Sequence, residues 1–161
     1  AKFDAKVNFT APDVNGFVGG SFEDGRKAYV GYGNNWGQNC QNFPSPGRIT
    51  TDPVKKATML GCGGEFADTD YGYYLLNHED LRWVPTDYIA MRTLKGAITI
   101  SADSGHPFLF GRINLGDRYA IGKVHNGKGA YKFWFIHKDN TEVGVLYGFE
   151  VLVCNSAIQK P

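Results

Sequence analysis

The chain has 161 residues, which is typical of one domain, and 17 basic side chains against 16 acidic ones give a formal net charge of +1. This balance excludes the strongly basic surface that nucleic acids require, and 42% hydrophobic residues exclude an intrinsically disordered chain. Glycine at 21 residues and aromatics at 14%, beside only 2 methionines, favour short strands and tight turns over a helical bundle.

Short runs rich in β-branched and aromatic residues, separated by glycines, recur along the chain and predict β-strands. The predicted strands cover residues 27–31, 71–76, 96–101, 107–111, 129–136 and 143–154. No stretch keeps a helical apolar period, and residues 87–95 are expected to form one helical turn at most. No run of 18 apolar residues occurs, so membrane insertion is not expected. We therefore predict an all-β fold, mostly β throughout, in a single domain over residues 1–161.

Residues 131–136 are apolar on both faces of a strand. This pattern predicts either a central strand between two layers or a face that packs against a partner, and the first interpretation is preferred. Trp36, Trp83 and Trp134 are expected to belong to the core, because large aromatic side chains dominate core burial.

Two segments of the chain repeat one pattern about 75 to 80 residues apart. Residues 28–32 (AYVGY) correspond to residues 108–112 (FLFGR), and residues 46–49 (PGRI) correspond to residues 121–124 (IGKV), each pair aligned on a glycine. We interpret the chain as two degenerate copies of one module. Repeat one covers about residues 1–80 and repeat two about residues 81–156.

Cysteine spacing gives no indication of a metal or cofactor. The chain has three cysteines and no CxxC pair. They are Cys40, Cys62 and Cys154. The alternatives left open are buried thiols, or one disulfide with one free thiol, Cys40 to Cys62 being the shorter loop. The first residue, Ala1, leaves a secreted or a cytoplasmic protein possible, with the secreted alternative preferred.

The second half carries a recognisable motif. Phe110-Gly111-Arg112 is followed by Gly122-Lys123-Val124-His125 and, after a glycine-containing turn, by the ending Phe149-Glu150-Val151-Leu152-Val153. With the opening Arg82-Trp83-Val84-Pro85, this order resembles the DM9 repeat, which occurs in small tandem-repeat invertebrate lectins and in the N-terminal module of natterin-like proteins. The resemblance covers nearly the whole chain and is more eroded in the first half.

The resemblance implies two pseudo-symmetric, interlocked repeats in one compact domain, frequent homodimerisation, and recognition of mannose by an Asp and a Lys of a repeat. In repeat two these positions correspond to Asp103 and Lys123, although Ile121 stands where the family usually has proline. In repeat one the carboxylate corresponds to Glu23 or Asp24, and Arg48 stands in place of the lysine.

The chemistry of such a pair suits a sugar. A carboxylate only accepts hydrogen bonds and an ammonium only donates them, so together they can hold two neighbouring hydroxyls. The alternative is a surface salt bridge between Asp103 and Lys123 with no ligand, of about 0 to 1 kcal/mol. If Lys123 binds sugar, Lys123→Ala is expected to remove binding and to leave the thermal midpoint nearly unchanged.

The sequence therefore predicts a mannose-type lectin of innate defence or cell-surface recognition. No HExxH motif or Gly-x-Ser-x-Gly elbow occurs, and an enzyme is not expected. The alternatives are a toxin- or defence-associated interaction module that binds no sugar and, less favoured, a hydrolase that uses Cys62 or a pair of carboxylates.

Overall fold

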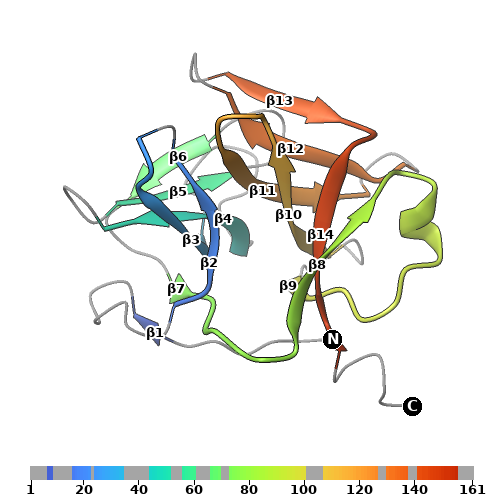
Figure 1. Cartoon of the computed structure of the whole chain (residues 1–161), viewed down its shortest axis with the longest axis horizontal. Coiled ribbons are helices and arrows are strands. Elements are labelled where there is room, and N and C mark those ends of the chain that lie inside the picture. The colour runs from blue at the N-terminus through green and yellow to red at the C-terminus, as the bar shows by residue number, and fades with distance from the viewer. Residues whose placement is uncertain are drawn as a thin grey trace.

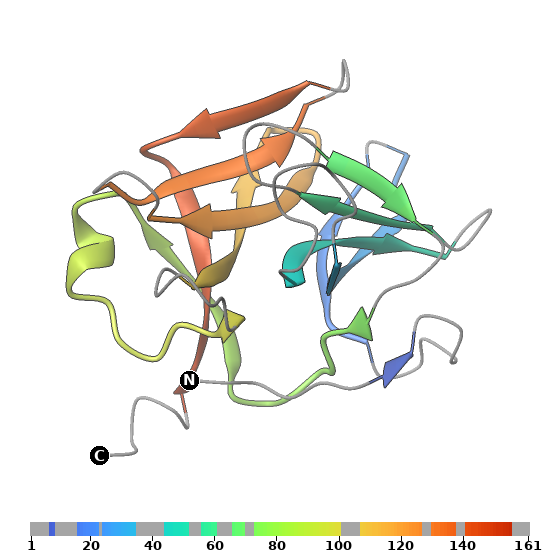
Figure 2. The ribbon, with the colours of Figure 1, turned by 180° about the vertical axis from the view of Figure 1, so that it is seen from behind.

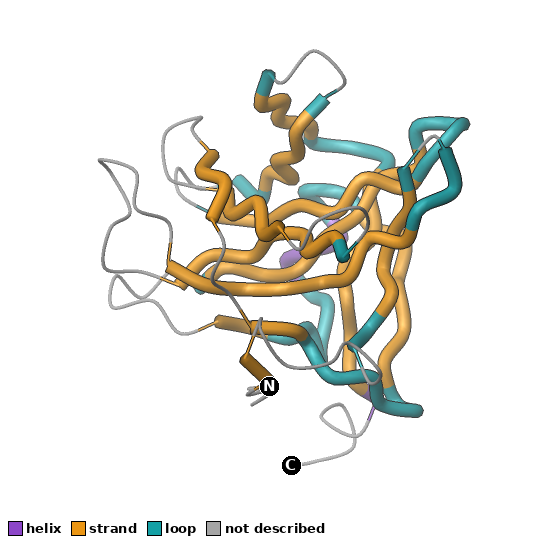
Figure 3. The backbone as a smooth tube through the Cα atoms, turned by 90° about the vertical axis from the view of Figure 1, so that its left-hand side faces the viewer, coloured by secondary structure: helices purple, strands orange, loops and turns teal. Residues whose placement is uncertain are grey.

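The computed structural model describes residues 7–8, 16–22, 24–34, 44–51, 56–60, 66–69, 73–100, 107–126, 130–137 and 141–155. Strands dominate this part of the chain, and its one named helical element is the short turn η1 (Ala90–Arg92) (Figure 3). The predicted mostly β fold is confirmed. Among the described residues, no helix has the length and apolar character needed to span a membrane.

Two seven-stranded antiparallel sheets lie side by side (Figures 1 and 2). Sheet one contains β1 (Val7–Asn8), β2 (Val18–Ser21), β3 (Lys27–Asn34), β4 (Pro44–Thr50), β5 (Lys56–Leu60), β6 (Phe66–Thr69) and β7 (Tyr73–Tyr74). Its order is β1-β7-β3-β4-β5-β6, with β2 also paired to β3. Sheet two contains β8 (Leu81–Thr86), β9 (Thr99–Ile100), β10 (Phe108–Asn114), β11 (Tyr119–His125), β12 (Lys132–Ile136), β13 (Glu142–Val145) and β14 (Phe149–Cys154). Its order is β13-β12-β11-β10-β14-β8, with β9 paired to β10.

Each sheet contains a pair of neighbouring strands in which two glycines lie opposite each other. Gly31 of β3 pairs with Gly47 of β4, and Gly111 of β10 pairs with Gly122 of β11. These are the glycines on which the two repeats align in the sequence. The shared register supports the two-repeat interpretation, and the spatial equivalence of the two halves stays a prediction.

The residues that follow Gly31 and Gly111 make different cross-strand pairs in the two sheets. In sheet two Arg112 lies opposite Glu150 and donates to its carboxylate through Nε at 3.3 Å and Nη2 at 3.2 Å. In sheet one Tyr32 lies opposite Tyr73, and their rings stack with centroids 5.4 Å apart. Arg112 Nη1 also donates to the carbonyl of Gly19 at 3.4 Å, so this guanidinium joins sheet two to sheet one.

The principal core lies between the sheets, where β11 contacts β4 and β2. Its buried members come from both sheets and the segments beside them: Ala28, Val30, Leu75, Ile98, Phe110, Ile121, Leu152 and Cys154. Side chains alternate across a strand, so Val151 and Val153 point to the other face of β14. They belong to a second core, which Met91 of η1 joins. A third cluster, around Ile49 and Met59, lies within sheet one.

β12 lies between β11 and β13, so it is an interior strand of sheet two, and a layer over each of its faces stays a prediction. Phe133 and Phe135 are buried in the second core. Trp134, on the other face, is half-buried, with Lys132 Nζ 4.8 Å from its ring centroid. Trp83 packs, partly buried, against the principal core, and Trp36 lies outside the described residues.

The strand predictions are confirmed in outline, and η1 lies within the predicted helical turn at 87–95. The predicted run 143–154 is two strands, because residues 146–148 turn at Gly148 with φ +73°. Sequence reasoning missed β1, β2, β4, β5, β6, β8 and β11. Cys154 is buried, and Cys40 and Cys62 lie outside the described residues.

Candidate functional site

The turn between β2 and β3 presents the first candidate residue. The backbone N–H of Phe22 donates to the Arg26 carbonyl at 2.9 Å, and that of Gly25 donates to the Phe22 carbonyl at 3.0 Å. Gly25 adopts φ +85°, a conformation that glycine allows without strain. This turn places Asp24 at the tip of the hairpin, with 58% of its side chain exposed.

Asp24 is held in place by Arg26. The Arg26 backbone N–H donates to Oδ1 at 3.2 Å, and its Nε donates to Oδ2 at 2.7 Å. The backbone hydrogen bond is the largest cause that lowers the pKa of Asp24 below its ordinary value of 3.8; desolvation opposes it, and the Arg26 side chain adds to the lowering. The carboxylate is therefore ionised at neutral pH and remains an acceptor.

Arg48, the other predicted residue of repeat one, approaches the same turn from β4. Its guanidinium carbon lies 4.8 Å from the centroid of the Phe22 ring, and that of Arg26 lies 4.6 Å from the same centroid. The structure thus gathers Asp24 and Arg48 around Phe22, with Arg26 between the carboxylate and the ring. Glu23 lies outside the described residues.

An open depression of about 360 Å³ lies beside this turn. Its volume is within the range of small-molecule sites, about 300 to 1,000 Å³. Charged and hydroxyl-bearing side chains line most of it: Asp24, Arg26, Lys27, Tyr29 and Thr51, with the backbone of Gly25. It offers an anionic acceptor, cationic donors and hydroxyls within one shallow surface, which is the mixture that a polyol requires.

Lys123, the predicted lysine of repeat two, lies in the interior. Only 3% of this residue is exposed, and its Nζ lies 5.1 Å from the centroid of Phe108. The ring of His125 lies 4.7 Å from the same ring. Because Lys123 is buried, the alternative of a solvated surface salt bridge does not describe it.

Asp103, the predicted carboxylate of repeat two, lies outside the described residues. The strand residues on either side of its segment, Ile100 of β9 and Phe108 of β10, are paired. Phe108 is the residue over which the Lys123 ammonium lies.

Asp24 is the one residue of the depression that was identified from the sequence; Arg26, Lys27, Tyr29 and Thr51 were not, and neither was Phe22 beside them. Arg26 follows Asp24 by two residues across a glycine, and this local spacing is a signal for a turn ion pair. Lys27 and Thr51 come together because β3 and β4 pair, which no local pattern shows. The role of Phe22 likewise depends on Arg48, which is 26 residues further along the chain (48 − 22).

No protein-family model matches the chain, and its sequence matches no curated protein significantly. The DM9 resemblance therefore stays a prediction that depends on the residues quoted for it.

Proposed function

We propose that this protein is a lectin that binds mannose-type glycans and acts in innate defence or cell-surface recognition. The observation that carries the proposal is the depression beside the β2–β3 turn, where the ionised Asp24 carboxylate lies at the surface next to Lys27 and Thr51. The DM9 resemblance, which implies mannose recognition, supplies the class of ligand.

The arrangement around Asp24 suits a sugar diol. A carboxylate has about four acceptor positions. Arg26 occupies one on each oxygen, which orients the group and leaves the other positions for ligand hydroxyls. Lys27 is exposed and supplies a charged donor at the same depression. Because the carboxylate is oriented before the ligand arrives, binding costs less conformational entropy.

A second site in repeat two is proposed around Asp103 and Lys123. Asn126 is a further candidate there, because it follows Gly122 by four residues as Thr51 follows Gly47. The Oδ1 atom of Asn126 is buried and accepts no hydrogen bond from the described residues. A buried acceptor without a donor costs free energy, which a ligand hydroxyl donating to it would recover.

The first prediction tests the carboxylate of repeat one. Asp24→Asn is expected to weaken binding to a mannose-bearing surface by at least roughly tenfold, because hydrogen bonds to a charged acceptor are about twice as strong as neutral ones. Its thermal midpoint should change little, since the side chain is exposed. The measurement is a glycan array with free mannose as competitor, combined with thermal unfolding of each variant.

Asp117→Asn is the matched control, because Asp117 is exposed in the β10–β11 turn and takes no part in the depression. Asp103→Ala tests repeat two in the same assay, and the double variant Asp24→Asn with Asp103→Ala should abolish the signal. If the folded wild-type protein binds no glycan on the array, the lectin proposal fails, and an interaction module without sugar binding becomes the better description.

We also propose a homodimer, which would multiply weak sugar sites into useful avidity. Two exposed apolar side chains near one end of sheet two support it: Ile89 is 54% and Tyr147 is 61% exposed, and Tyr147 packs edge-on against Tyr88, the neighbour of Ile89, at 5.3 Å. Ile89→Asp is expected to convert a dimer to a monomer in sedimentation equilibrium. Val18→Asp, at the exposed Val18 of β2, is the control, and a wild-type monomer at every concentration tested rejects the proposal.

A further inference from the structure

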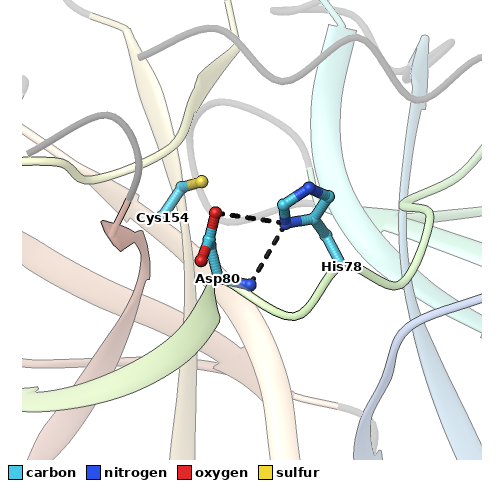
Figure 4. Close-up of side chains that lie close together, drawn as sticks. All are labelled: His78, Asp80 and Cys154. Atoms are coloured by element: carbon cyan, nitrogen blue, oxygen red, sulfur yellow. Dashed lines mark hydrogen bonds and ion pairs between the residues drawn. The ribbon is translucent and has the colours of Figure 1, made fainter. Parts of the chain in front are cut away.

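Three side chains of metal-binding type meet where the connection between the two sheets reaches the end of β14 (Figure 4). They are His78, Asp80 and Cys154. The Nδ1 atom of His78 lies 3.7 Å from Oδ2 of Asp80. One ligand atom from each of the three residues lies within 4.8 Å of the other two.

Backbone hydrogen bonds hold this cluster together. The N–H of Leu81 donates to the His78 carbonyl at 3.1 Å, and the N–H of Asn155 donates to the Asp80 carbonyl at 2.9 Å. Leu81 and Cys154 are paired residues of β8 and β14. The turn that carries His78 and Asp80 is thus fixed to the strand end that carries Cys154, and the ligand positions are largely preformed.

We propose that His78, Asp80 and Cys154 bind a zinc ion. Imidazole nitrogen, carboxylate oxygen and thiolate sulfur are the donors that Zn²⁺ takes in proteins, with bonds of about 2.0 to 2.3 Å. A nitrogen and an oxygen ligand in tetrahedral geometry lie roughly 3.3 to 3.6 Å apart, and the 3.7 Å between Nδ1 and Oδ2 is close to this separation. The thiol sulfur lies within 4.8 Å of the other two ligand atoms, so a movement of up to roughly 1 Å completes the set.

The hydrogen bonding of His78 agrees with a ligand role. Its Nδ1 accepts a hydrogen bond from the Asp80 backbone N–H at 3.1 Å, which orients this nitrogen toward the cluster. A metal ion would take the place of that N–H at Nδ1. The neutral imidazole is the form that binds metal.

The exposure of the three side chains indicates the side from which a metal ion can reach the site. The side chains of His78 and Asp80 are 44% and 35% exposed, whereas Cys154 is 5% exposed. The ion therefore enters from the histidine side and rests on the buried sulfur. Three protein ligands leave the fourth position for water, as in zinc sites that keep an open position.

Sequence spacing did not indicate this site. Asp80 and Cys154 are separated by 74 residues (154 − 80), and zinc motifs read from sequence depend on pairs of Cys or His ligands with two to five residues between them. Only the pairing of β8 with β14 brings the cysteine to the turn.

The test is a titration of the untagged, metal-free and reduced protein with Co²⁺ as a spectroscopic probe, followed by displacement with Zn²⁺. Wild type is expected to bind one ion per chain with a thiolate-to-cobalt band in the near ultraviolet, and Cys154→Ser should lose that band. His78→Ala, a change at an exposed residue, should weaken Zn²⁺ binding by roughly 100-fold or more, because few ligands share the binding energy.

His137→Ala is the matched control, since His137 lies outside the cluster, and it should bind as wild type does. Zn²⁺ should also raise the thermal midpoint of wild type and of His137→Ala but not that of His78→Ala. The proposal is overturned if the folded wild type takes up neither ion. It is also overturned if His78→Ala and Cys154→Ser bind as tightly as wild type, because the ion would then lie elsewhere.

Discussion

Replacing Lys123 with alanine is expected to lower the free energy of unfolding by about 2 to 4 kcal/mol, the range for truncating a long buried side chain. The residue is 3% exposed. It lies on the same face of β11 as Ile121, whose side chain belongs to the core between the sheets. Its ammonium lies over Phe108, so alanine removes a cation–π contact and leaves a cavity. Urea unfolding measures the change.

Lys123→Met is the informative companion variant. Methionine keeps most of the length of the side chain and removes the ammonium group, so its cost in stability should be clearly smaller than that of alanine. If sugar binding is lost in the methionine variant while the protein stays folded, the ammonium has a role in the ligand site. If alanine costs less than about 0.5 kcal/mol, as a surface substitution does, the burial of Lys123 is refuted.

This result would differ from the expectation drawn from the sequence, which was that Lys123→Ala leaves the thermal midpoint nearly unchanged. Motif register can match a lysine to a binding residue, but it carries no information on burial. The burial arises because β11 contacts β4 and β2 across the interface between the sheets.

The β class was predictable because short apolar runs and glycines are local features. The strands that were missed depend on pairing with distant strands, which a local sequence pattern does not show. Pro44 and Pro46 argue against a central strand, yet β4 lies between β3 and β5. Pro85 fits its position in β8, because β8 is an edge strand of sheet two and an edge strand tolerates a residue without a backbone N–H.

The sequence predicted two charged residues of the candidate site but not the side chains that they contact. Asp24 and Arg48 were identified from their place in the repeat, and the structure gathers both near Phe22. The link through Arg26 depends on the side-chain geometry of a turn. The cluster of His78, Asp80 and Cys154 depends on a strand pairing between distant parts of the chain. Both features arise from tertiary structure, which spacing along one sequence does not encode.

The alignment of glycines between the repeats was the sequence feature that carried most structural information. The aligned residues are Gly31 with Gly111 and Gly47 with Gly122, and in each sheet they face each other across one strand pair. At such positions the neighbouring backbone and side chains come close enough to leave no room for a Cβ atom.

The largest effect on the fold itself is expected from Gly122→Ala, which should lower the free energy of unfolding by about 3 kcal/mol or more through overpacking. A Cβ at this position would clash with the Trp134 carbonyl oxygen and would lie 2.9 Å from a ring carbon of Phe133. Because the first of these atoms is backbone, β12 must move away from β11 to make room. The measurement is chemical denaturation of wild type and variant, followed by Trp fluorescence, which gives the difference in their free energies of unfolding.

Gly47→Ala and Gly116→Ala give this experiment its controls. A Cβ at Gly47 would clash with the Thr58 carbonyl and lie 2.6 Å from Met59 Sδ, so a loss similar to that of Gly122→Ala is expected. Gly116 has φ +92° in an open turn with no atom within 4 Å, and alanine there should cost only about 1 kcal/mol of backbone strain. Equal losses at Gly47 and Gly122 would support the equivalence of the two repeats. If Gly47→Ala leaves the free energy of unfolding unchanged while Gly122→Ala lowers it, the two sheets have the same strand register but differ in how side chains pack around these glycines.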